Sequence, residues 1–355
     1  MITGYLTIGA FFLVSFLALI ERYLGKYKLA LYLLTAFSLT LIAGLREVGI
    51  DPDSENYEYS FLRSTFSSPD TSESMEISFL WLSSVLNLFT NDVHVLLLFY
   101  AFWGLTFKFI ALRRLSELWF LPVAVYISSF FINHEMMQIR TAVLSGAFLL
   151  ALSYQAEGRR AMALLLILVG TFFHYSGFVL LPLLFLSSEP MSLKKRLLWV
   201  SALPAAYVMF FVGINVIMSA DIPLIGAKLA SYQSEEETGT GVGYVNVFRP
   251  LHLFSIALML YLLCFYDTIA AKSRHFTLLL KVFILGLCSY EVFGFLPVLA
   301  QRLNMLLTIV TIPLFTYIYY TIRPKWGGIL AVILIAFVYL NYALPNISFH
   351  LLWKG

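Results

Sequence analysis

Long apolar runs separated by short polar turns dominate the pattern of residues along this chain. A helix needs about 20 mostly apolar residues to cross a bilayer. The pattern predicts membrane-spanning helices at residues 3–20, 29–45, 93–112, 119–133, 139–155, 197–219, 250–271, 276–294, 303–322 and 327–344. The stretch 160–190 is also apolar, but His174 and its polar neighbours and then Pro182 interrupt it. We expect a hairpin of two short helices there, reversing near His174.

The composition agrees with a chain that is embedded in a lipid bilayer. Of its 355 residues, 60% are apolar and only 12% are charged, and the mean hydropathy is +0.85. A soluble domain carries about 25% charged residues, so a soluble enzyme, a secreted disulfide scaffold and a nucleic-acid-binding module are excluded. The net charge of +3 is too small to indicate a polyanionic partner. The predicted fold class is an all-α polytopic membrane protein, with one transmembrane domain over residues 1–355.

Basic residues predict how the spans are oriented, because short cytoplasmic loops are enriched in Lys and Arg. Most of the 23 basic residues fall in clusters that can face the cytoplasm together: Arg22/Lys26/Lys28, Lys108/Arg113/Arg114, Arg159/Arg160, Lys194/Lys195/Arg196, Lys272/Arg274 and Arg323/Lys325. This orientation predicts about twelve spans with both termini outside. It also requires that residues 77–90 do not cross, so we expect an amphipathic or re-entrant helix there on the outer face.

Two outer segments are longer than a simple connection. Residues 46–92 are acidic and contain the predicted amphipathic helix, and residues 220–249 contain three glutamates followed by a glycine-rich run. Loops of this length often carry function. The glycine-rich run has no preceding strand and lacks a Gly-Lys-Ser/Thr ending, so a phosphate loop is disfavoured. A lid is the better interpretation.

Ionisable groups at membrane depth are costly and therefore mark candidate functional sites. In the predicted map they gather at the outer ends of the spans, which indicates a site that opens outward. The outer set consists of Arg46, Asp51, Tyr57, Glu76, His134, Glu135, Arg140, His174, Arg249, His252, Glu291 and Arg302.

Three arginines of this set lie at outer helix starts. Arg140, Arg249 and Arg302 each precede or open a predicted span. Guanidinium groups suit phosphate oxygens, and the three could converge on one anionic group with help from helix dipoles. The alternative is that each arginine reaches to lipid phosphates at the membrane surface.

His174 is the most informative candidate base, because it sits at the expected reversal and an imidazole titrates near neutral pH. Asp51 and Glu76 are rival bases. The alternatives are that His174 only satisfies free backbone groups of the turn, and that each carboxylate is only an arginine's partner. The spacing of His, Cys and Asp does not resemble a zinc site, and there is no nucleophile elbow, so no metal or cofactor is expected.

At this point an ordered set of short motifs resembles the EpsG/Wzy-type polysaccharide polymerases. The shared elements, spread over roughly residues 40–320, are Arg46-Glu-Val-Gly49-Ile-Asp51 followed by Tyr57, then Glu76, Met137-Gln138-Ile139-Arg140, Phe172-Phe173-His174-Tyr175-Ser176 with Leu181-Pro182, and Arg302. The chain departs from the family pattern at Pro52, Ile77 and Thr141. These departures affect the substrate more than the class.

The resemblance implies a GT-C-like glycosyltransferase of the bacterial inner membrane, acting at its outer face without a metal. It would polymerise undecaprenyl-diphosphate-linked repeat units by an inverting reaction, with membrane lipids and a chain-length regulator protein as partners and no nucleic acid. His174, Asp51 and Glu76 would be the catalytic candidates. Arg46, Tyr57, Arg140, Arg249, Glu291 and Arg302 would bind substrate. Rival functions are an O-antigen ligase, a lipid-linked-glycan flippase or transporter, and a membrane acyltransferase.

Overall fold

The computed structural model describes residues 2–64, 76–219 and 245–349, and every regular element in these ranges is helical. Helices satisfy their own backbone hydrogen bonds, as lipid requires. Seven helices in the described residues are long and apolar enough to cross a membrane: Ile2–Tyr23, Gly25–Gly44, His94–Leu115, Ile139–Ala156, Leu193–Gly213, Pro297–Tyr320 and Lys325–Ile347. A polytopic membrane architecture is therefore confirmed, while the total of twelve spans and the GT-C-like fold stay predictions.

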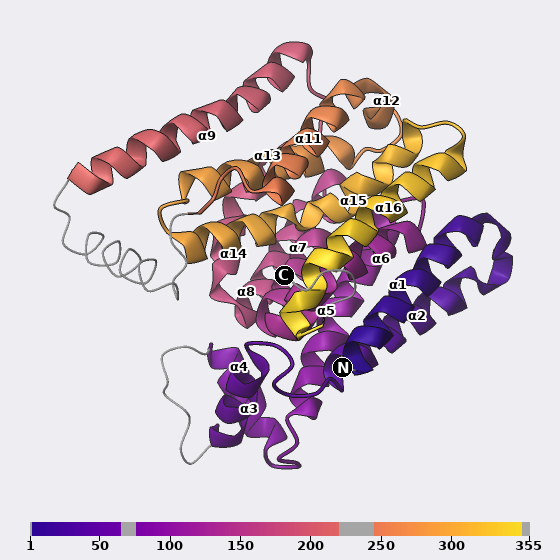
Figure 1. The fold of residues 1–355 in the computed structure, drawn as a ribbon, viewed down its shortest axis with the longest axis vertical. Coiled ribbons are helices and arrows are strands. Elements are labelled where there is room, and N and C mark those ends of the chain that lie inside the picture. The colour runs from indigo at the N-terminus through magenta and orange to yellow at the C-terminus, as the bar shows by residue number, and fades with distance from the viewer. Residues whose placement is uncertain (1, 65–75, 220–244, 350–355) are drawn as a thin grey trace. The chain divides into compact units, whose positions relative to one another are not determined.

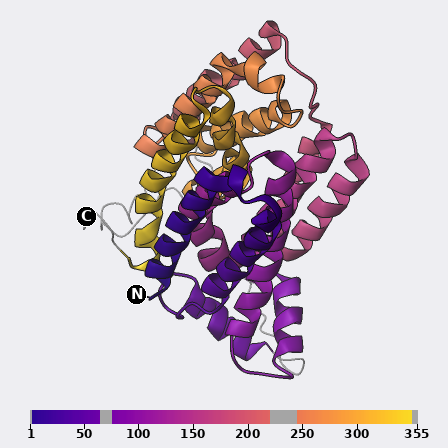
Figure 2. The ribbon, with the colours of Figure 1, turned by 90° about the vertical axis from the view of Figure 1, so that its right-hand side faces the viewer.

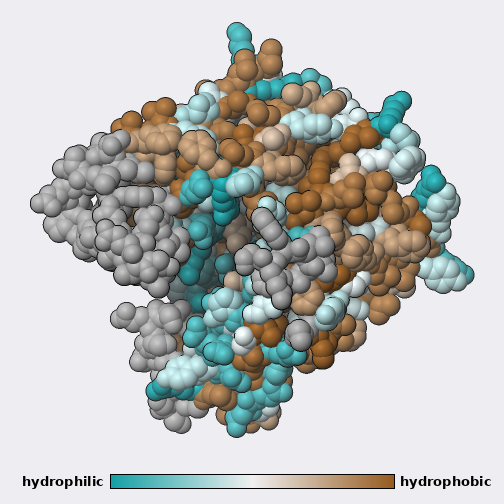
Figure 3. Space-filling model, in the orientation of Figure 1, coloured by the Kyte–Doolittle hydropathy of each residue, from teal (hydrophilic) through white to brown (hydrophobic). Residues whose placement is uncertain are grey.

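The chain divides into two compact units, of which the first comprises residues 1–185 and 312–355. Its helices are α1 (Ile2–Ile20), α2 (Lys28–Gly44), α3 (Ser54–Arg63), α4 (Ile77–Leu86), α5 (His94–Leu115), α6 (Phe120–Tyr126), a π-helix (Ile127–Met137), α7 (Ile139–Ala156), α8 (Arg160–Phe173), α15 (Thr311–Thr316) and α16 (Lys325–Ala343). The antiparallel pair α1 and α2 lies side by side in both ribbon views (Figures 1 and 2). Hydrophobic side chains cover the flank that this pair forms (Figure 3), as expected of a lipid-facing surface.

Helices α5 and α7 cross closely in the middle of the first unit because small residues face each other there. A Cβ atom added to Gly146 would lie 2.8 Å from the Gly104 carbonyl oxygen and 3.2 Å from Lys108 Cγ. Small residues let helix backbones approach in membranes. The contact brings polar groups of α5 next to the start of α7.

The predicted hairpin in residues 160–190 is present. Helix α8 ends at Phe173 and a 3₁₀ helix, Tyr175–Phe185, follows, with His174 extended between them at φ −155° and ψ 117°. Pro182 lies inside the 3₁₀ helix. The segment after Glu76 also agrees with the sequence, because α4 has 10 residues and is about 15 Å long at about 1.5 Å per residue. It is too short to cross a bilayer core of about 30 Å.

The span predicted at residues 119–133 takes a different form. A short α6 passes into a π-helix that runs on to Met137. The hydrogen-bond pattern of the π-helix, in which each N–H reaches back five residues, ends where the Gln138 N–H donates to the Asn133 carbonyl at 3.0 Å. Segments of π-helix occur often at functional sites, and this one leads directly into the first turn of α7.

The second unit comprises residues 186–311. Its helices are α9 (Leu193–Ser219), α11 (Pro250–Cys264), α12 (Tyr266–Ala270), α13 (Phe276–Val292) and α14 (Pro297–Leu307). Helix α13 forms its core and packs on α9, α11 and α14. The predicted span at 250–271 is broken after Cys264, where α11 gives way to the short α12.

Candidate active site

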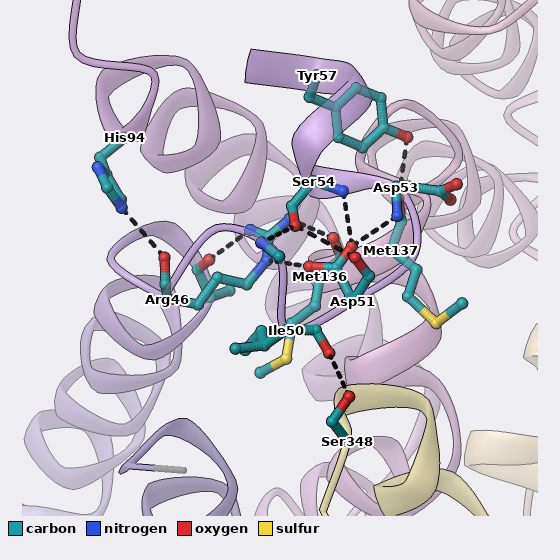
Figure 4. Close-up of polar contacts among 12 residues, drawn as sticks. Arg46, Ile50, Asp51, Asp53, Ser54, Tyr57, His94, Met136, Met137 and Ser348 are labelled. Carbon is teal, nitrogen blue, oxygen red and sulfur yellow. Dashed lines mark hydrogen bonds and ion pairs between the residues drawn. The ribbon is translucent and has the colours of Figure 1, made fainter. Parts of the chain in front are cut away.

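Arg46 is a buried clamp between three segments of the first unit. Its Nε donates to Asp51 Oδ2 at 3.0 Å and its Nη1 to the Ala43 carbonyl at 2.7 Å, while Nη2 donates to the Met136 carbonyl. Both side chains of the Arg46–Asp51 ion pair are fully buried, and Figure 4 shows the guanidinium group enclosed by these partners. Arg46 therefore ties the end of α2 to the π-helix instead of lining an open cavity.

Asp51 starts α3 in addition to pairing with Arg46. Its Oδ1 accepts hydrogen bonds from the backbone N–H groups of Asp53, at 3.1 Å, and Ser54, at 2.9 Å. Gly49 permits the preceding turn, because its φ of +89° is strained for other residues. The Ser54 hydroxyl in turn accepts the Gly49 N–H at 2.8 Å. These contacts support the partner-carboxylate interpretation of Asp51, the alternative to its being a base.

Tyr57 joins this clamp to the start of α7. Its hydroxyl donates to the Met137 carbonyl at 2.9 Å, as Figure 4 shows, and it also accepts a hydrogen bond from Arg140. The side chain is buried. Burial raises the pKa of Tyr57 to about 12, which outweighs the opposite effect of Arg140. The phenol is therefore neutral at physiological pH and positions Arg140 as a hydrogen-bond partner.

Three predicted site residues meet around one carboxylate. Glu76 precedes the first turn of α4, Arg140 is the second residue of α7, and His174 lies in the break of the α8 hairpin. Glu76 Oε2 accepts a hydrogen bond from Arg140 Nη1, and Glu76 Oε1 contacts His174 Nδ1. The exposed fractions of the side chains are 7% for Glu76 and 17% each for Arg140 and His174, so a ligand can reach the two outer partners.

This arrangement determines what each group can do in proton transfer. A carboxylate ion-paired with arginine only accepts hydrogen bonds, so the contact from His174 Nδ1 places a proton on that nitrogen. The basic nitrogen of a neutral imidazole is then Nε2. Glu76 thus orients His174 and holds its tautomer, while the positive charge of Arg140 lies on the other side of the same carboxylate. The geometry suits a histidine base beside a site for an anionic group.

A second polar network lies deeper in the first unit. Lys108 Nζ donates to Glu135 Oε1 and to the Ala142 carbonyl, both at 2.6 Å. The Tyr126 hydroxyl donates to the same Glu135 oxygen, also at 2.6 Å. The side chains of Lys108 and Glu135 have no exposed surface. The ion pair therefore fastens α5 to the end of the π-helix and to the first turn of α7, which carries Arg140.

The sequence interpretation of Lys108 was wrong. It grouped Lys108 with the cytoplasmic basic residues, but the side chain points into the helix bundle and is fully buried. The missed signal is its place inside an apolar run, one turn after Gly104, since an ionisable residue within a span needs a partner. Gly104 leaves room for that partner: a Cβ there would lie 2.6 Å from Glu135 Oε2. Glu135 had been predicted only as one of the outer polar groups.

Other predicted residues belong to the second unit. His252 Nε2 and Glu291 Oε1 are 2.5 Å apart and both side chains are almost fully buried. The Arg249 guanidinium lies 4.8 Å from the centre of the Tyr290 ring. Arg302 is exposed in the middle of α14, which already begins at Pro297, so the prediction that it lies at a helix start was wrong. The structure thus gathers Arg249, His252 and Glu291 within one unit, whereas the convergence of Arg140, Arg249 and Arg302 on one anionic group stays a prediction.

Two further predictions concern the second outer loop and metal binding. Most of the predicted outer loop at 220–249 lies outside the described residues. Within the described ranges, no group of three or more His, Cys, Asp or Glu side chains is placed to hold a metal ion.

A family model described as the EpsG family matches residues 29–354, which is most of the chain and includes the Arg46 clamp and the Glu76, Arg140 and His174 cluster. No curated protein and no solved structure matches.

Proposed function

We propose, because this chain belongs to the EpsG family, that it polymerises undecaprenyl-diphosphate-linked oligosaccharide repeat units at the outer face of the bacterial inner membrane. The family supports a polysaccharide polymerase-like role, and the apolar helices support a multi-pass membrane protein. The observation that carries the more specific proposal is the pairing of Glu76 with both His174 and Arg140. It supplies a positioned base next to a cation, which the transfer of a glycan from a diphosphate requires.

In the proposed reaction His174 is the base and Glu76 its positioning residue. His174 Nε2 takes the proton of the acceptor sugar's hydroxyl as that oxygen attacks the anomeric carbon of the donor glycan. The bond between this carbon and the diphosphate oxygen breaks on the opposite face, and the diphosphate leaves with the electron pair. A single displacement of this kind inverts the anomeric configuration.

Arg140 holds the leaving diphosphate in this proposal. A guanidinium offers five donors and keeps its charge at all physiological pH values, so it can contact Glu76 and phosphate oxygens together. Charge that develops on the diphosphate strengthens this contact in the transition state. Because arginine can supply that stabilisation, the proposed reaction is metal-independent.

The membrane placement belongs to the same proposal. About twelve spans in a GT-C-like fold, with the basic loops in the cytoplasm, put the site at the outer surface. Membrane lipids surround the spans and a chain-length regulator protein is a proposed partner. The lipid-linked glycan then enters from the outer leaflet.

The test uses the purified protein in nanodiscs with a synthetic undecaprenyl-diphosphate-linked repeat unit. We expect a ladder of products, formed in the presence of a metal chelator and with inverted linkages. Absence of a ladder from active-site-intact protein would refute polymerisation. Transfer only to a lipid A core acceptor would identify a ligase, and movement of the lipid-linked unit across the bilayer without transfer would identify a flippase.

Two variants test the assigned site. Arg140→Ala and His174→Ala should each abolish the ladder while the protein is still expressed and folded. The matched control is Arg63→Ala, which removes an exposed arginine of α3 that has no part in the proposed site and should leave the ladder intact. Long products from both site variants would remove the proposed site.

A further inference from the structure

Helix α4 exposes an apolar face. Its inner face packs Phe79 and Leu82 into a buried cluster with Tyr57 and Phe61 of α3, and α3 and α4 lie together in Figure 1. The opposite face exposes 71% of Ile77 and 57% of Trp81, and the residues just after the helix expose 67% of Leu88 and 82% of Phe89. A surface helix of a water-facing domain has a polar outer face, so this apolar face needs an apolar covering.

The position of α4 along the chain identifies lipid as that covering. Four residues separate Phe89 from His94, the first residue of the candidate span α5. At about 3.5 Å per residue, Phe89 lies within roughly 17 Å of the point where α5 begins to cross. Helix α4 is itself too short to span, and exposed aromatic residues such as Trp81 are enriched where a protein meets the membrane surface.

We propose that α4 lies in the outer membrane interface, with the face formed by Ile77, Trp81 and Leu88 and the adjoining Phe89 seated in lipid. An interfacial helix buries its apolar face about 5–10 Å into the boundary between headgroups and acyl chains. Glu76 immediately precedes the first residue of α4, so a lipid-seated helix holds the Glu76 carboxylate and its partners Arg140 and His174 at headgroup depth.

This placement, which rests on the proposed function for its consequence, deepens the substrate assignment. The diphosphate of a polyprenyl-linked glycan lies at the same depth as the phosphates of neighbouring lipids. A site fixed at that depth meets the diphosphate of a membrane-embedded substrate, whereas a water-soluble nucleotide sugar has no such constraint. Helix α4 thus favours lipid-linked donors, because it fixes the depth of the site relative to the lipid phosphates.

The test measures the depth of α4 directly and needs no enzymatic activity. In a background with Cys264→Ser and Cys288→Ser, a spin label is attached at Leu88→Cys, and its collisions with oxygen and with a water-soluble nickel chelate are compared in nanodiscs. The matched control is a label at Asn56→Cys, an exposed polar position of the neighbouring α3. We expect oxygen to dominate at position 88 and the nickel chelate to dominate at position 56.

Two outcomes would overturn the proposal. Equal preference for the nickel chelate at both positions would place the apolar face in water. A label at position 88 that neither reagent reaches would show that a protein surface, from a second copy or another partner, covers it. Both results are independent of whether the protein makes polysaccharide, so they are distinguishable from a failure of the proposed function.

A kinetic measurement tests the consequence for the substrate. Trp81→Ser should raise KM for the lipid-linked repeat unit and leave kcat nearly unchanged, because it weakens the seating of α4 without touching the reacting groups. Trp326→Ser is the control, since Trp326 is also exposed but lies at the start of α16. Equal effects of the two substitutions would overturn the link between α4 and substrate capture.

Discussion

Replacing Lys108 with methionine should destabilise the first unit strongly, although the residue takes no part in the proposed chemistry. The substitution keeps an unbranched side chain of similar length and removes the ammonium group. It deletes two hydrogen bonds of 2.6 Å, to Glu135 and to the Ala142 carbonyl. Glu135 then stays buried as a charge that has lost its countercharge, although the Tyr126 hydroxyl still donates to it. Breaking a buried ion pair by removing one partner costs about 3–5 kcal/mol, so we expect a loss of at least about 3 kcal/mol.

The measurement is the free energy of unfolding in mixed micelles, followed by circular dichroism as SDS is added. The double variant Lys108→Met with Glu135→Gln removes both charges and should recover most of the loss, because a neutral pair avoids the uncompensated charge. A single variant within about 1 kcal/mol of the wild type, or a double variant no better than the single one, would refute this account of the network.

Three further predictions concern neighbouring contacts. Gly104→Ala should lower the free energy of unfolding by about 1–3 kcal/mol, since the new Cβ meets Glu135 at 2.6 Å; a change below that range in the same SDS titration would contradict the close approach. Asp51→Asn leaves Arg46 buried without its countercharge and should cost about 3 kcal/mol, visible as a lower unfolding midpoint, whereas an unchanged midpoint would show that the ion pair is dispensable. The pKa of Tyr57 is about 12 in the folded protein and about 10 in the unfolded chain. At about 1.4 kcal/mol per pKa unit, this difference contributes about 2–3 kcal/mol to the free energy of unfolding. The contribution is fully present below about pH 10 and is lost as the pH rises to about 12. The unfolding free energy of Tyr57→Phe should lack this part of the alkaline decline, and an identical decline in both proteins would contradict the burial of the phenol.

The sequence was sufficient for features that depend on local pattern. The reversal at His174 followed from polar residues and Pro182 interrupting an apolar stretch, and the structure has a helix break there. The distribution of basic residues likewise required that residues 77–90 do not cross, and α4 has only 10 residues. In both cases the placement of apolar, polar and basic residues along the chain was enough to predict the form of the segment.

Pairings between distant segments could not be obtained in the same way. Glu76 contacts Arg140 and His174, which are 64 and 98 residues away along the chain, and no local pattern specifies which carboxylate meets which cation. The sequence therefore left Glu76 as a rival base, whereas its contacts are the basis for our proposal that it positions His174. The partner of Lys108 could not be predicted for the same reason, because Glu135 is 27 residues away, although the position of Lys108 inside an apolar run already indicated a buried charge.

The measurement that tests the central claim most directly is the rate of ladder formation by Glu76→Gln in nanodiscs with the undecaprenyl-diphosphate-linked repeat unit. Glutamine keeps the size of the side chain and its hydrogen-bonding oxygen but loses the charge that fixes the His174 tautomer. We predict that kcat falls by about 10²–10⁴, the contribution of a positioned base, while the variant still binds the lipid-linked unit. A wild-type rate from Glu76→Gln would contradict the assignment of Glu76 as the residue that positions the His174 base.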